Sequence, residues 1–339
     1  METIYKYLHE NPECSGKEHK TNKYVLEILE KYNPKIFKIK LSIVAFFNMQ
    51  QSETLAFRSE LDALPISEDI SHKICSKNDS MHACGHDIHT SALLQLCEHI
   101  KSNKFNHNIA LIFQSKEETG LGSKDIIKSK LFKKLKITKV IGMHVWPNLE
   151  FDKIYSNKNL MFGSYELDIN IWGKPNHVST YSNKTDATFA SYLIYKKLLK
   201  FKKNKIAHLG KIQSGIIRNI SSDHATLYYS VRFKKNKNIE DKIRRMKLNT
   251  NCDVDYNFKE YYPPLICSKN LLEIINPQKV KTLKSAEDFG YYKEKAETLY
   301  LLYGLGTGYN LHTNKFTTNI EQRKCYYNKL VEVIDKFKI

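Results

Sequence analysis

The sequence predicts an α/β protein with a mixed, mostly parallel sheet and flanking helices, interrupted by a smaller α+β domain. The first half of the chain alternates near-continuous apolar runs with stretches of helical periodicity. This pattern is typical of strands buried on both faces of a sheet and joined by helices. The middle of the chain instead alternates apolar and polar residues in period two, as half-exposed strands do. Because the C-terminal part returns to the first pattern, we interpret the middle as an insert.

The first half is expected to place polar loops at strand ends, where ligands collect in open α/β sheets. Helical periodicity over residues 3–31 predicts a first helix. Asn33 ends it, because the residue before a proline disfavours the helical conformation. The other expected elements are strands at 36–47, 54–57, 108–114 and 140–145, and helices at 92–100 and 124–135.

The insert shows the element order β-α-β-β-α-β, the split βαβ arrangement of ferredoxin-like domains. Its first strand, residues 165–172, is expected at an exposed sheet edge, where unpaired backbone groups favour pairing with a second copy of the chain. We expect residues 1–162 with 263–339 to form one domain and residues 163–262 the insert. The expected elements are strands at 165–172, 213–220, 225–233 and 254–261, helices at 187–200 and 239–246, then strand 299–304 and helix 322–337.

The composition excludes several classes of protein. A chain of 339 residues that is 41% hydrophobic can bury a real core, which argues against a mostly disordered protein. No apolar run approaches the roughly 20 residues needed to cross a bilayer, and the start lacks the pattern of a signal peptide. We therefore expect a soluble cytoplasmic protein that does not contact membranes. The seven cysteines form no CxxC pair and are expected to be reduced thiols.

The net charge of +18 raises nucleic-acid binding as an alternative. Only six of the 54 basic residues are arginines, and the lysines are spread along the whole chain. Base recognition favours arginine for its bidentate fork, so scattered lysines are more typical of a solvated surface. We expect no nucleic-acid partner.

Residues 82–89 read His-Ala-Cys-Gly-His-Asp-Ile-His, the densest group of potential metal ligands in the chain. Thiolate and imidazole are the usual ligands of borderline-soft divalent metals. Gly85 allows a tight loop that aims Cys84 and His86 at one point. The alternative is a polar loop with a structural thiol, and the motif alone favours neither.

Further residues of types that bind metals support a metal site more strongly together than each does alone. Glu117 and Glu118 follow a buried strand; such a pair is more often surface charge, but one carboxylate can bind metal while the other holds a water. His144 taken alone is best read as a hydrogen-bonded core histidine, and His312 as an ordinary loop residue. Together with the cysteine motif, however, they equip a site for two metals, one shared ligand and a carboxylate base, as metal-assisted hydrolysis requires. The full set is Cys84, His86, Glu118, His144 and His312 as ligands, with Glu117 as base.

The whole chain resembles the amidohydrolase branch of the dinuclear-metal aminoacylase and carboxypeptidase superfamily. That branch includes hippurate hydrolases, auxin-conjugate hydrolases and N-acetyldiaminopimelate deacetylases. The Met-His-Ala-Cys-Gly-His-Asp run is the most specific motif, and weaker runs occur in family order. The matching runs are Leu8-His9-Glu10-Asn11-Pro12-Glu13, Arg58–Pro65, Met81–His89, Ile112-Phe113-Gln114 with Glu117-Glu118, Gly142-Met143-His144-Val145, Gly173 with His177, Glu287-Asp288-Phe289 and Leu311-His312.

The resemblance implies a zinc-peptidase-like catalytic domain, a ferredoxin-like lid and dimerisation domain, and a homodimer. It implies two divalent ions per chain, Zn²⁺ or Mn²⁺ with Co²⁺ or Ni²⁺ as alternatives, and Glu117 as general base and acid. His177 matches a residue that reaches a neighbouring active site and stabilises the oxyanion. Asn219 and Arg232 match substrate-binding positions. Asp62 is expected to orient a ligand histidine.

The expected activity is hydrolysis of a linear amide bond that removes an acyl group, with acetyl as first choice, from an N-acyl-L-amino acid. Within the branch, the resemblance is closest to the N-acetyldiaminopimelate deacetylases of lysine biosynthesis. The alternatives are a general aminoacylase or small-peptide hydrolase, or a catalytically silent binding protein on the same fold. Two departures bear on substrate preference: Glu60 stands where the family usually has Asp, and Pro175-Asn176 stands where it usually has Gly-Gly.

Overall fold

The computed structural model describes residues 1–201, 205–235 and 238–339, which form two compact units. Unit 1 contains Met1–Leu160, Ile266–Lys281 and Asp288–Ile339, and unit 2 contains Met161–Leu265 with Thr282–Glu287. The short return segment lies with unit 2 because its backbone pairs with the start of the insert, where the amide of Phe162 donates to the carbonyl of Leu283 at 3.1 Å. The observed division therefore differs from the expected one at residues 161–162, 263–265 and 282–287.

Unit 1 is built on an eight-stranded mixed sheet in the order β1-β2-β4-β3-β5-β14-β6-β13. The central strands β4, β3, β5 and β14 run parallel to one another. Their carboxyl ends therefore meet at one edge of the sheet. The strands are β1 (Lys35–Ile39), β2 (Ser42–Phe47), β3 (Thr54–Glu60), β4 (Asn108–Gln114), β5 (Ile137–Trp146), β6 (Ile154–Ser156), β13 (Gln278–Lys279) and β14 (Glu297–Gly304). The short strands β7 (Asn159–Met161) and β12 (Leu265–Ile266) pair separately.

Helices flank this sheet, as the apolar strand pattern predicts. Helix α3 packs on β3, β4 and β5, and α1, α2 and α9 pack around α3, while α5 packs on β5 and α8 on β14. The helices of unit 1 are α1 (Glu2–Glu10), α2 (His19–Glu30), α3 (His86–Lys101), α4 (Gly122–Lys128), α5 (Leu131–Lys134), α8 (Lys269–Ile275), η2 (Asp288–Glu294) and α9 (Ile320–Asp335).

Three predicted helices are wrong in their extent, and the strand expected over 36–47 is the antiparallel pair β1 and β2. The helix expected over 124–135 is two short helices, α4 and α5, because the extended backbone of Ser129 ends α4. The helix expected over 3–31 is two helices, because Pro12 disfavours the helical conformation at Asn11, where α1 ends with φ −128°. Helix α3 begins at His86 instead of residue 92, so it includes half of the cysteine–histidine motif. The polar first turn of α3 is buried and obscured its helical pattern in the sequence.

Unit 2 is a four-stranded antiparallel sheet in the order β11-β8-β10-β9, covered by two helices. The predicted β-α-β-β-α-β order is confirmed. The elements are β8 (Gly163–Trp172), η1 (Val178–Thr180), α6 (Ala187–Leu198), β9 (Lys205–Ser214), β10 (His224–Phe233), α7 (Ile239–Arg244) and β11 (Asp253–Tyr262).

Two details of the insert differ from expectation. Strand β8 lies between β11 and β10 and not at an edge, because period-two alternation reports one solvated face and cannot tell central strands from edge strands. The strand expected at 213–220 lies at Lys205–Ser214. Gly215, at φ +69°, ends it, and the exposed Ile216 and Ile217 that follow belong to a loop.

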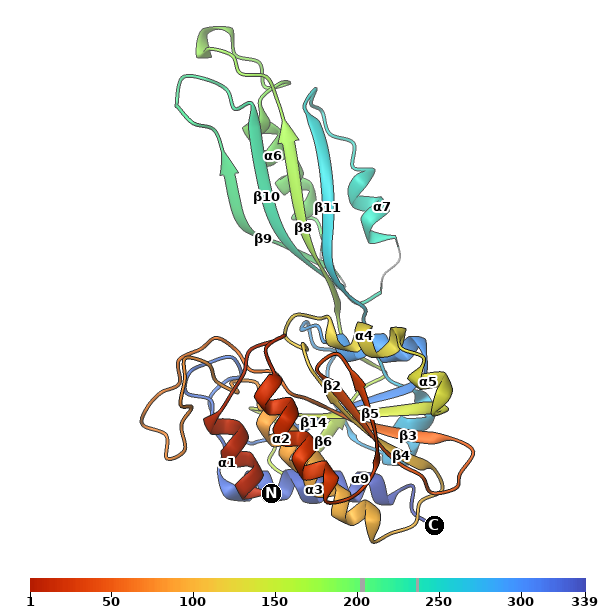
Figure 1. Ribbon diagram of the computed structural model, residues 1–339. Coiled ribbons are helices and arrows are strands. Elements are labelled where there is room, and N and C mark those ends of the chain that lie inside the picture. The colour runs from red at the N-terminus through yellow and green to blue at the C-terminus, as the bar shows by residue number, and fades with distance from the viewer. Residues whose placement is uncertain (202–204, 236–237) are drawn as a thin grey trace. The chain divides into compact units, whose positions relative to one another are not determined.

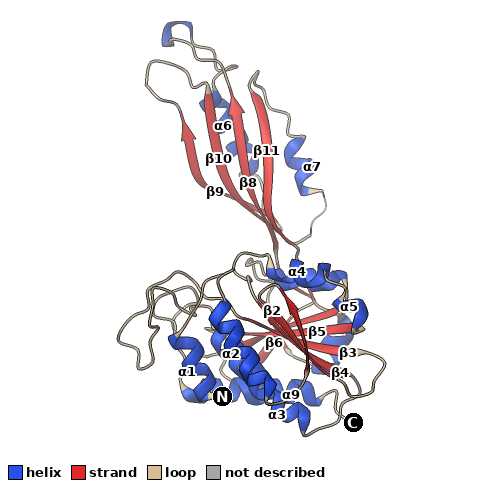
Figure 2. Ribbon diagram, in the orientation of Figure 1, coloured by secondary structure: helices blue, strands red, loops and turns tan. Residues whose placement is uncertain are grey.

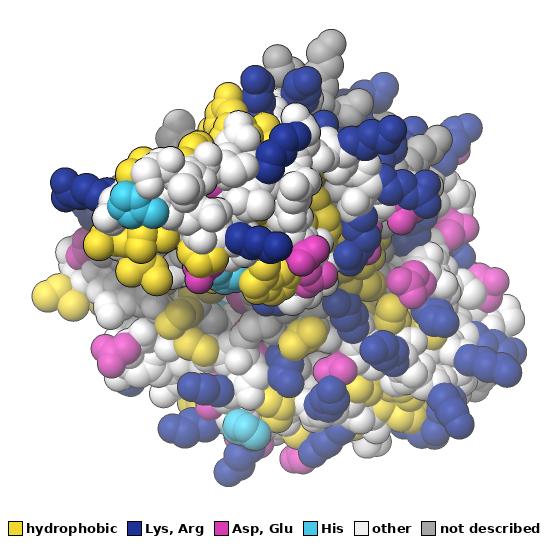
Figure 3. All heavy atoms as spheres, turned by 90° about the horizontal axis from the view of Figure 1, so that it is seen from above, with side chains coloured by type: hydrophobic (Ala, Val, Ile, Leu, Met, Phe, Trp, Pro, Cys, Tyr) yellow, Lys and Arg dark blue, Asp and Glu magenta, His cyan; other side chains and the backbone are white. Residues whose placement is uncertain are grey.

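In the part of the chain that the structure describes, no helix is both long and apolar enough to cross a membrane. Each of the seven cysteines lies in that part and is a free thiol. On the face drawn in Figure 3, Lys and Arg side chains are scattered among acidic and hydrophobic ones.

Candidate metal centre

The ligand-type residues of unit 1 gather where parallel strands end. Asp62 follows β3, Glu117 and Glu118 follow β4, and His144 lies near the end of β5. Since β4, β3 and β5 are parallel neighbours, their carboxyl ends bring these residues to one edge of the sheet. The tertiary fold thus collects residues that lie up to 82 positions apart.

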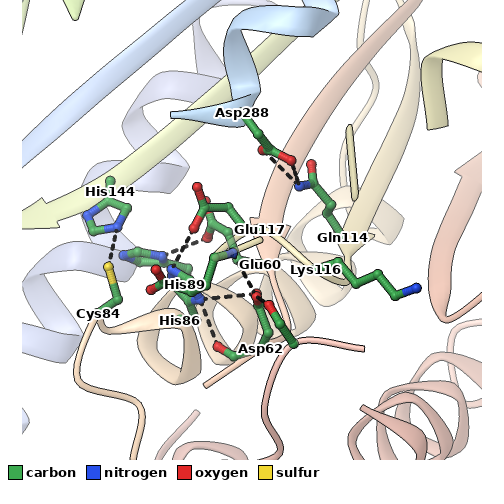
Figure 4. A network of polar contacts seen from close by, with 12 residues as sticks. Glu60, Asp62, Cys84, His86, His89, Gln114, Lys116, Glu117, His144 and Asp288 are labelled. Carbon is green, nitrogen blue, oxygen red and sulfur yellow. Dashed lines mark hydrogen bonds and ion pairs between the residues drawn. The ribbon is translucent and has the colours of Figure 1, made fainter. Parts of the chain in front are cut away.

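Cys84 and His86 reach this edge from the start of α3. Gly85 between them adopts φ +81°, and a Cβ atom there would lie 2.6 Å from Cγ2 of Val145. Glycine is therefore required both for the turn and for its close packing on β5. The turn aims the Cys84 thiol and the His86 ring into the same buried space (Figure 4).

Two histidines are held in the tautomer that binds metals. The Nδ1–H of His86 donates to the backbone carbonyl of Asp62 at 2.8 Å, and the Nδ1–H of His144 donates to the carbonyl of Val145 at 2.7 Å. Because a carbonyl only accepts, the proton of each neutral ring is on Nδ1, which leaves Nε2 as a lone-pair donor. The carboxylate of Asp62 lies 3.4 Å from Nδ1 of His86, so Asp62 orients this histidine.

The two glutamates of the turn after β4 point to different neighbours. Oε2 of Glu117 lies 3.9 Å from Nε2 of His86, whereas Oε1 of Glu118 lies 3.5 Å from Nε2 of His312. The backbone amide of Glu118 donates to Oδ2 of Asp62 at 2.9 Å. Asp62 therefore supports both a histidine and the glutamate turn.

His312 completes the group from a loop after β14. Its Nε2 lies 3.2 Å from the Cys84 sulfur, and its amide donates to the carbonyl of Ala83 at 2.9 Å. The residue has φ +61°, a conformation that costs free energy in a non-glycine residue and concentrates at functional sites.

The donor atoms form overlapping groups of a size that suits metal ions. Within the described residues, ligand atoms lie within 4.8 Å of one another in Cys84–His86–His144, in Cys84–Glu118–His312 and in His86–Glu117–Glu118. Cys84, His86 and Glu118 are each common to two of the groups. Among the described residues, Nε2 of His86 and Oε1 of Glu118 are buried without a hydrogen-bond partner. A thiolate, imidazole lone pairs and carboxylates around such orphaned atoms fit divalent cations.

Electrostatics of the group also favour a cation. Burial lowers the pKa of His86, but the Asp62 and Glu118 carboxylates outweigh burial and raise it overall. Burial raises the pKa of Glu118 despite the nearby histidines. Burial also disfavours the ionised form of Asp62, yet hydrogen bonds from His86 and Ser15 hold its pKa below the usual range. The carboxylates thus draw positive charge into a desolvated site.

A buried polar network behind the metal-ligand group escaped the sequence analysis. The Nδ1–H of His89 donates to Glu60 at 2.8 Å, and the backbone amide of Val145 donates to Nε2 of His89 at 3.0 Å. Both ring nitrogens are thus engaged, which makes His89 a support for the strand that carries His144. Glu60 also pairs with Arg58. The sequence feature that could have predicted this network is the three-residue spacing of His86 and His89, which puts both rings on one face of a helix.

Unit 2 carries the remaining predicted residues. His177 is exposed and its Nδ1 lies 2.8 Å from the hydroxyl of Ser179. The carbonyl of Asn219 accepts from the amide of Val178 at 2.9 Å, so the loops of His177 and Asn219 lie together. Strand β10 begins at His224, five residues after Asn219. Arg232 lies near the other end of this strand, eight residues or roughly 26 Å from His224. The structure therefore does not place Arg232 with the other two.

Comparisons with known proteins agree with this architecture. A curated relative, the N-acetyldiaminopimelate deacetylase of Lactococcus lactis subsp. cremoris, is 26% identical, with 94% of this chain and 93% of the relative covered. A hydrolase of Staphylococcus epidermidis, named as uncharacterized, is 27% identical over 98% of this chain and 95% of its own length.

Solved structures share the fold. A dinuclear metal binding peptidase of the M20 family from Bacillus subtilis superposes with a TM-score of 0.83 at 23% identity, covering 99% of this chain and 98% of that one. A protein of methicillin-resistant Staphylococcus aureus superposes with a TM-score of 0.90 at 24% identity, covering 98% and 95%. Residues 56–335 match the description Peptidase family M20/M25/M40. With its fold and most of its length thus accounted for, the chain belongs to peptidase family M20/M25/M40.

Proposed function

We propose that this protein is a two-metal amidohydrolase that removes an acyl group, with acetyl as first choice, from an N-acyl-L-amino acid. The observation that carries the proposal is the clustering of Cys84, His86, Glu118, His144 and His312, with Glu117 beside His86. Family membership supports a hydrolase, and the named deacetylase relatives support the substrate class.

In this proposal the five clustered residues would hold two divalent ions. Zn²⁺ suits the thiolate and imidazoles, while the carboxylate also admits Mn²⁺, and Co²⁺ or Ni²⁺ are alternatives. Bound ions would supply a Lewis acid for the substrate carbonyl and lower the pKa of water.

In this proposal Glu117 carries out both proton transfers of the reaction. Glu117 takes a proton from the attacking water as oxygen bonds to the carbonyl carbon. The same carboxyl group gives the proton to the amine nitrogen as the C–N bond breaks, so the products are a carboxylic acid and a free amino acid. Glu117 is buried, and its Oε2 lies 3.9 Å from Nε2 of His86 (Figure 4), within reach of a water held at the same group.

The experiment that tests these roles compares Glu117→Gln with Glu118→Gln. We expect Glu117→Gln to retain two metal ions and lose at least about 10²-fold in kcat, since the amide keeps the shape but carries no proton. Glu118→Gln should lose metal first. Equal metal loss in both variants, or a near-normal rate in Glu117→Gln, would reject the assignment.

A panel of substrates tests the substrate class and separates the alternatives. We expect metal-loaded protein to hydrolyse N-acetyl amino acids, with N-acetyldiaminopimelate as the leading candidate. Broad hydrolysis of many N-acyl amino acids or of dipeptides would favour a general aminoacylase or peptidase instead. Tight binding of these compounds without turnover would favour a silent binding protein.

We further propose that unit 2 forms a homodimer through β9. This strand lies at the edge of its sheet. Its outward Ile212 is 52% exposed, and Ile216 and Ile217 in the following loop are 95% and 57% exposed. Unpaired backbone beside exposed aliphatic side chains favours a second identical strand. Light scattering should show a dimer at micromolar concentration and a monomer for Ile212→Lys; a monomeric wild type would refute the proposal.

In that dimer we propose that His177 stabilises the oxyanion in the partner's active site. Subunit mixing tests this without further structures. Glu117→Gln and His177→Ala homodimers should each be inactive. A mixed dimer, however, contains one site with both residues intact, so an equal mixture should regain up to about a quarter of wild-type activity. No recovery on mixing would place His177 in its own subunit's site or outside catalysis.

A further inference from the structure

The segment between α1 and α2, residues 15–18, touches the glutamate turn from behind. Oε1 of Glu18 accepts a hydrogen bond from the backbone amide of Lys116 at 2.8 Å. Ser15 donates its hydroxyl proton to Oδ2 of Asp62, the atom that also accepts from the amide of Glu118. The segment therefore contacts the turn directly at Lys116 and, through Asp62, indirectly at Glu118.

The backbone that Glu18 holds is strained. Lys116 has φ +60°, a conformation that costs a non-glycine residue free energy and persists only where its surroundings impose it. The side chain of Lys116 points away from His86 and Cys84 (Figure 4). It lies instead against Gly16, where an added Cβ would come within 3.2 Å of its Cε atom. The strained conformation directs Glu117 and Glu118 toward the metal-ligand group.

Helix capping does not explain Glu18. It occupies the N-cap position of α2 but makes no side-chain capping hydrogen bond. Glu13 caps the helix instead, because its Oε2 accepts from the amide of Thr21 at 2.8 Å and from the Thr21 hydroxyl at 2.9 Å. The Glu18 side chain therefore does not cap α2, and its hydrogen bond to the Lys116 amide needs another explanation.

The position of Glu18 is also costly. The residue is fully buried, and its Oε2 has no hydrogen-bond partner among the described residues. Burying a polar oxygen without a partner destabilises a protein. Burial raises the pKa of the carboxyl group, although backbone amides of Gly16, Glu18 and Lys116 oppose the rise.

We propose that Glu18 is a positioning residue: its carboxyl oxygen holds the Lys116 amide and thereby sets the direction of Glu118 as metal ligand and Glu117 as base. This inference rests on the proposed function. It assigns a catalytic contribution to a residue that touches neither metal nor substrate.

Three variants separate the effect of the length of the Glu18 side chain from the effect of its charge and from the stability of α2. Glu18→Asp keeps the charge but withdraws the oxygen by one methylene, whereas Glu18→Gln keeps the reach without the charge. Glu13→Asp is the matched control, since it shortens by one methylene a neighbouring carboxylate that contacts Thr21 of α2. The measured quantity is Co²⁺ affinity of the full chain by competition with a chelator, read from the visible spectrum of the Co²⁺–thiolate complex, alongside the melting temperature.

We expect Glu18→Asp to weaken Co²⁺ binding by roughly 10–100-fold, as the loss of supporting hydrogen bonds does at other metal sites. Glu18→Gln should stay within about threefold of wild type, because an amide oxygen still accepts from the Lys116 amide. Glu13→Asp should lower the melting temperature without changing affinity. Wild-type affinity in Glu18→Asp, equal weakening in Glu18→Asp and Glu18→Gln, or equal weakening in Glu13→Asp would each overturn the inference. A wild type that binds no Co²⁺ would instead refute the proposed function.

Discussion

Arg58 is the perturbation that best tests the buried network behind the metal-ligand group. Its side chain is fully buried between two carboxylates: Nη2 donates to Asp288 at 2.8 Å, Nη1 pairs with Glu60, and Nε donates to Gln114 at 3.0 Å. Arg58→Met approximates the volume and leaves both carboxylates without this cation. Breaking a buried pair in this way costs about 3–5 kcal/mol.

The two carboxylates should not share this cost equally. Asp288 keeps three contacts from two donor atoms, two from Nε2 of Gln114 at 2.8–2.9 Å and one from the Ser123 amide at 3.0 Å. Among the described residues, the carboxylate of Glu60 keeps the Nδ1–H of His89 as its one remaining side-chain donor. Neutralising Glu60 should therefore rescue more than neutralising Asp288. We expect Arg58→Met with Glu60→Gln to recover about 1–3 kcal/mol, and Arg58→Met with Asp288→Asn to recover less than half of that.

Urea unfolding can report unit 1 alone. The chain has two tryptophans, Trp146 in unit 1 and the half-exposed Trp172 in unit 2. Trp172→Phe leaves Trp146 as the only tryptophan of the chain, so the fluorescence reports the unfolding of unit 1. The free energy of unfolding is then obtained for unit 1 alone, and no single two-state value has to be fitted to both units. Chelator must be present in every sample, because bound metal stabilises the folded state. A loss below about 1 kcal/mol for Arg58→Met, or equal rescue by the two second changes, would refute the assignment of the cost to Glu60.

Three further outcomes are expected. Burial disfavours the charged form of His9, but its hydrogen bonds to Asp87 and Glu68 raise its pKa to about 10. The free energy of unfolding that the charged His9 contributes is therefore complete below about pH 6.5 and is lost as the pH rises toward 10. Urea titrations should show this decline in the wild type and not in His9→Gln. Gly122→Ala should lower the melting temperature sharply, because its Cβ would overlap the Ser115 carbonyl oxygen, and a wild-type melting temperature would contradict this. Addition of divalent metal at 100 times its Kd should raise the free energy of unfolding by about 2.7 kcal/mol for each ion bound, and chelator should reverse the gain; no shift in calorimetry would argue against metal binding to the folded chain.

The local patterns of the sequence predicted the central strands of unit 1 better than the strands expected at 36–47 and 213–220, of which the first is the pair β1 and β2 and the second lies at Lys205–Ser214. β4 runs from Asn108 to Gln114 as expected, because an apolar run of this length is typical of a strand and too short for an average helix. Helix limits were less predictable. The break at Asn11 and the early start of α3 depend on one proline and on one glycine at φ +81°, whose effect a periodicity of apolar residues does not register.

Within the metal-ligand group, residue type and position at strand ends pointed to the candidate ligands, because the chemistry of thiolate, imidazole and carboxylate is a property of the side chain alone. How these side chains meet depended on the parallel order of β4, β3 and β5, which no local pattern encodes.

The sequence by itself determined that the chain alternates strands and helices around a buried sheet, carries an inserted β-α-β-β-α-β unit and has side chains of the types that bind divalent metals near strand ends. These properties follow from local periodicity and side-chain chemistry. Only the tertiary structure decided that β8 is central, that Arg232 lies apart from His177, and that Glu18 holds the turn of Glu117 and Glu118. The physical reason is that strand neighbours and buried hydrogen bonds join residues distant in the chain, and their pairing depends on the packing of the whole unit.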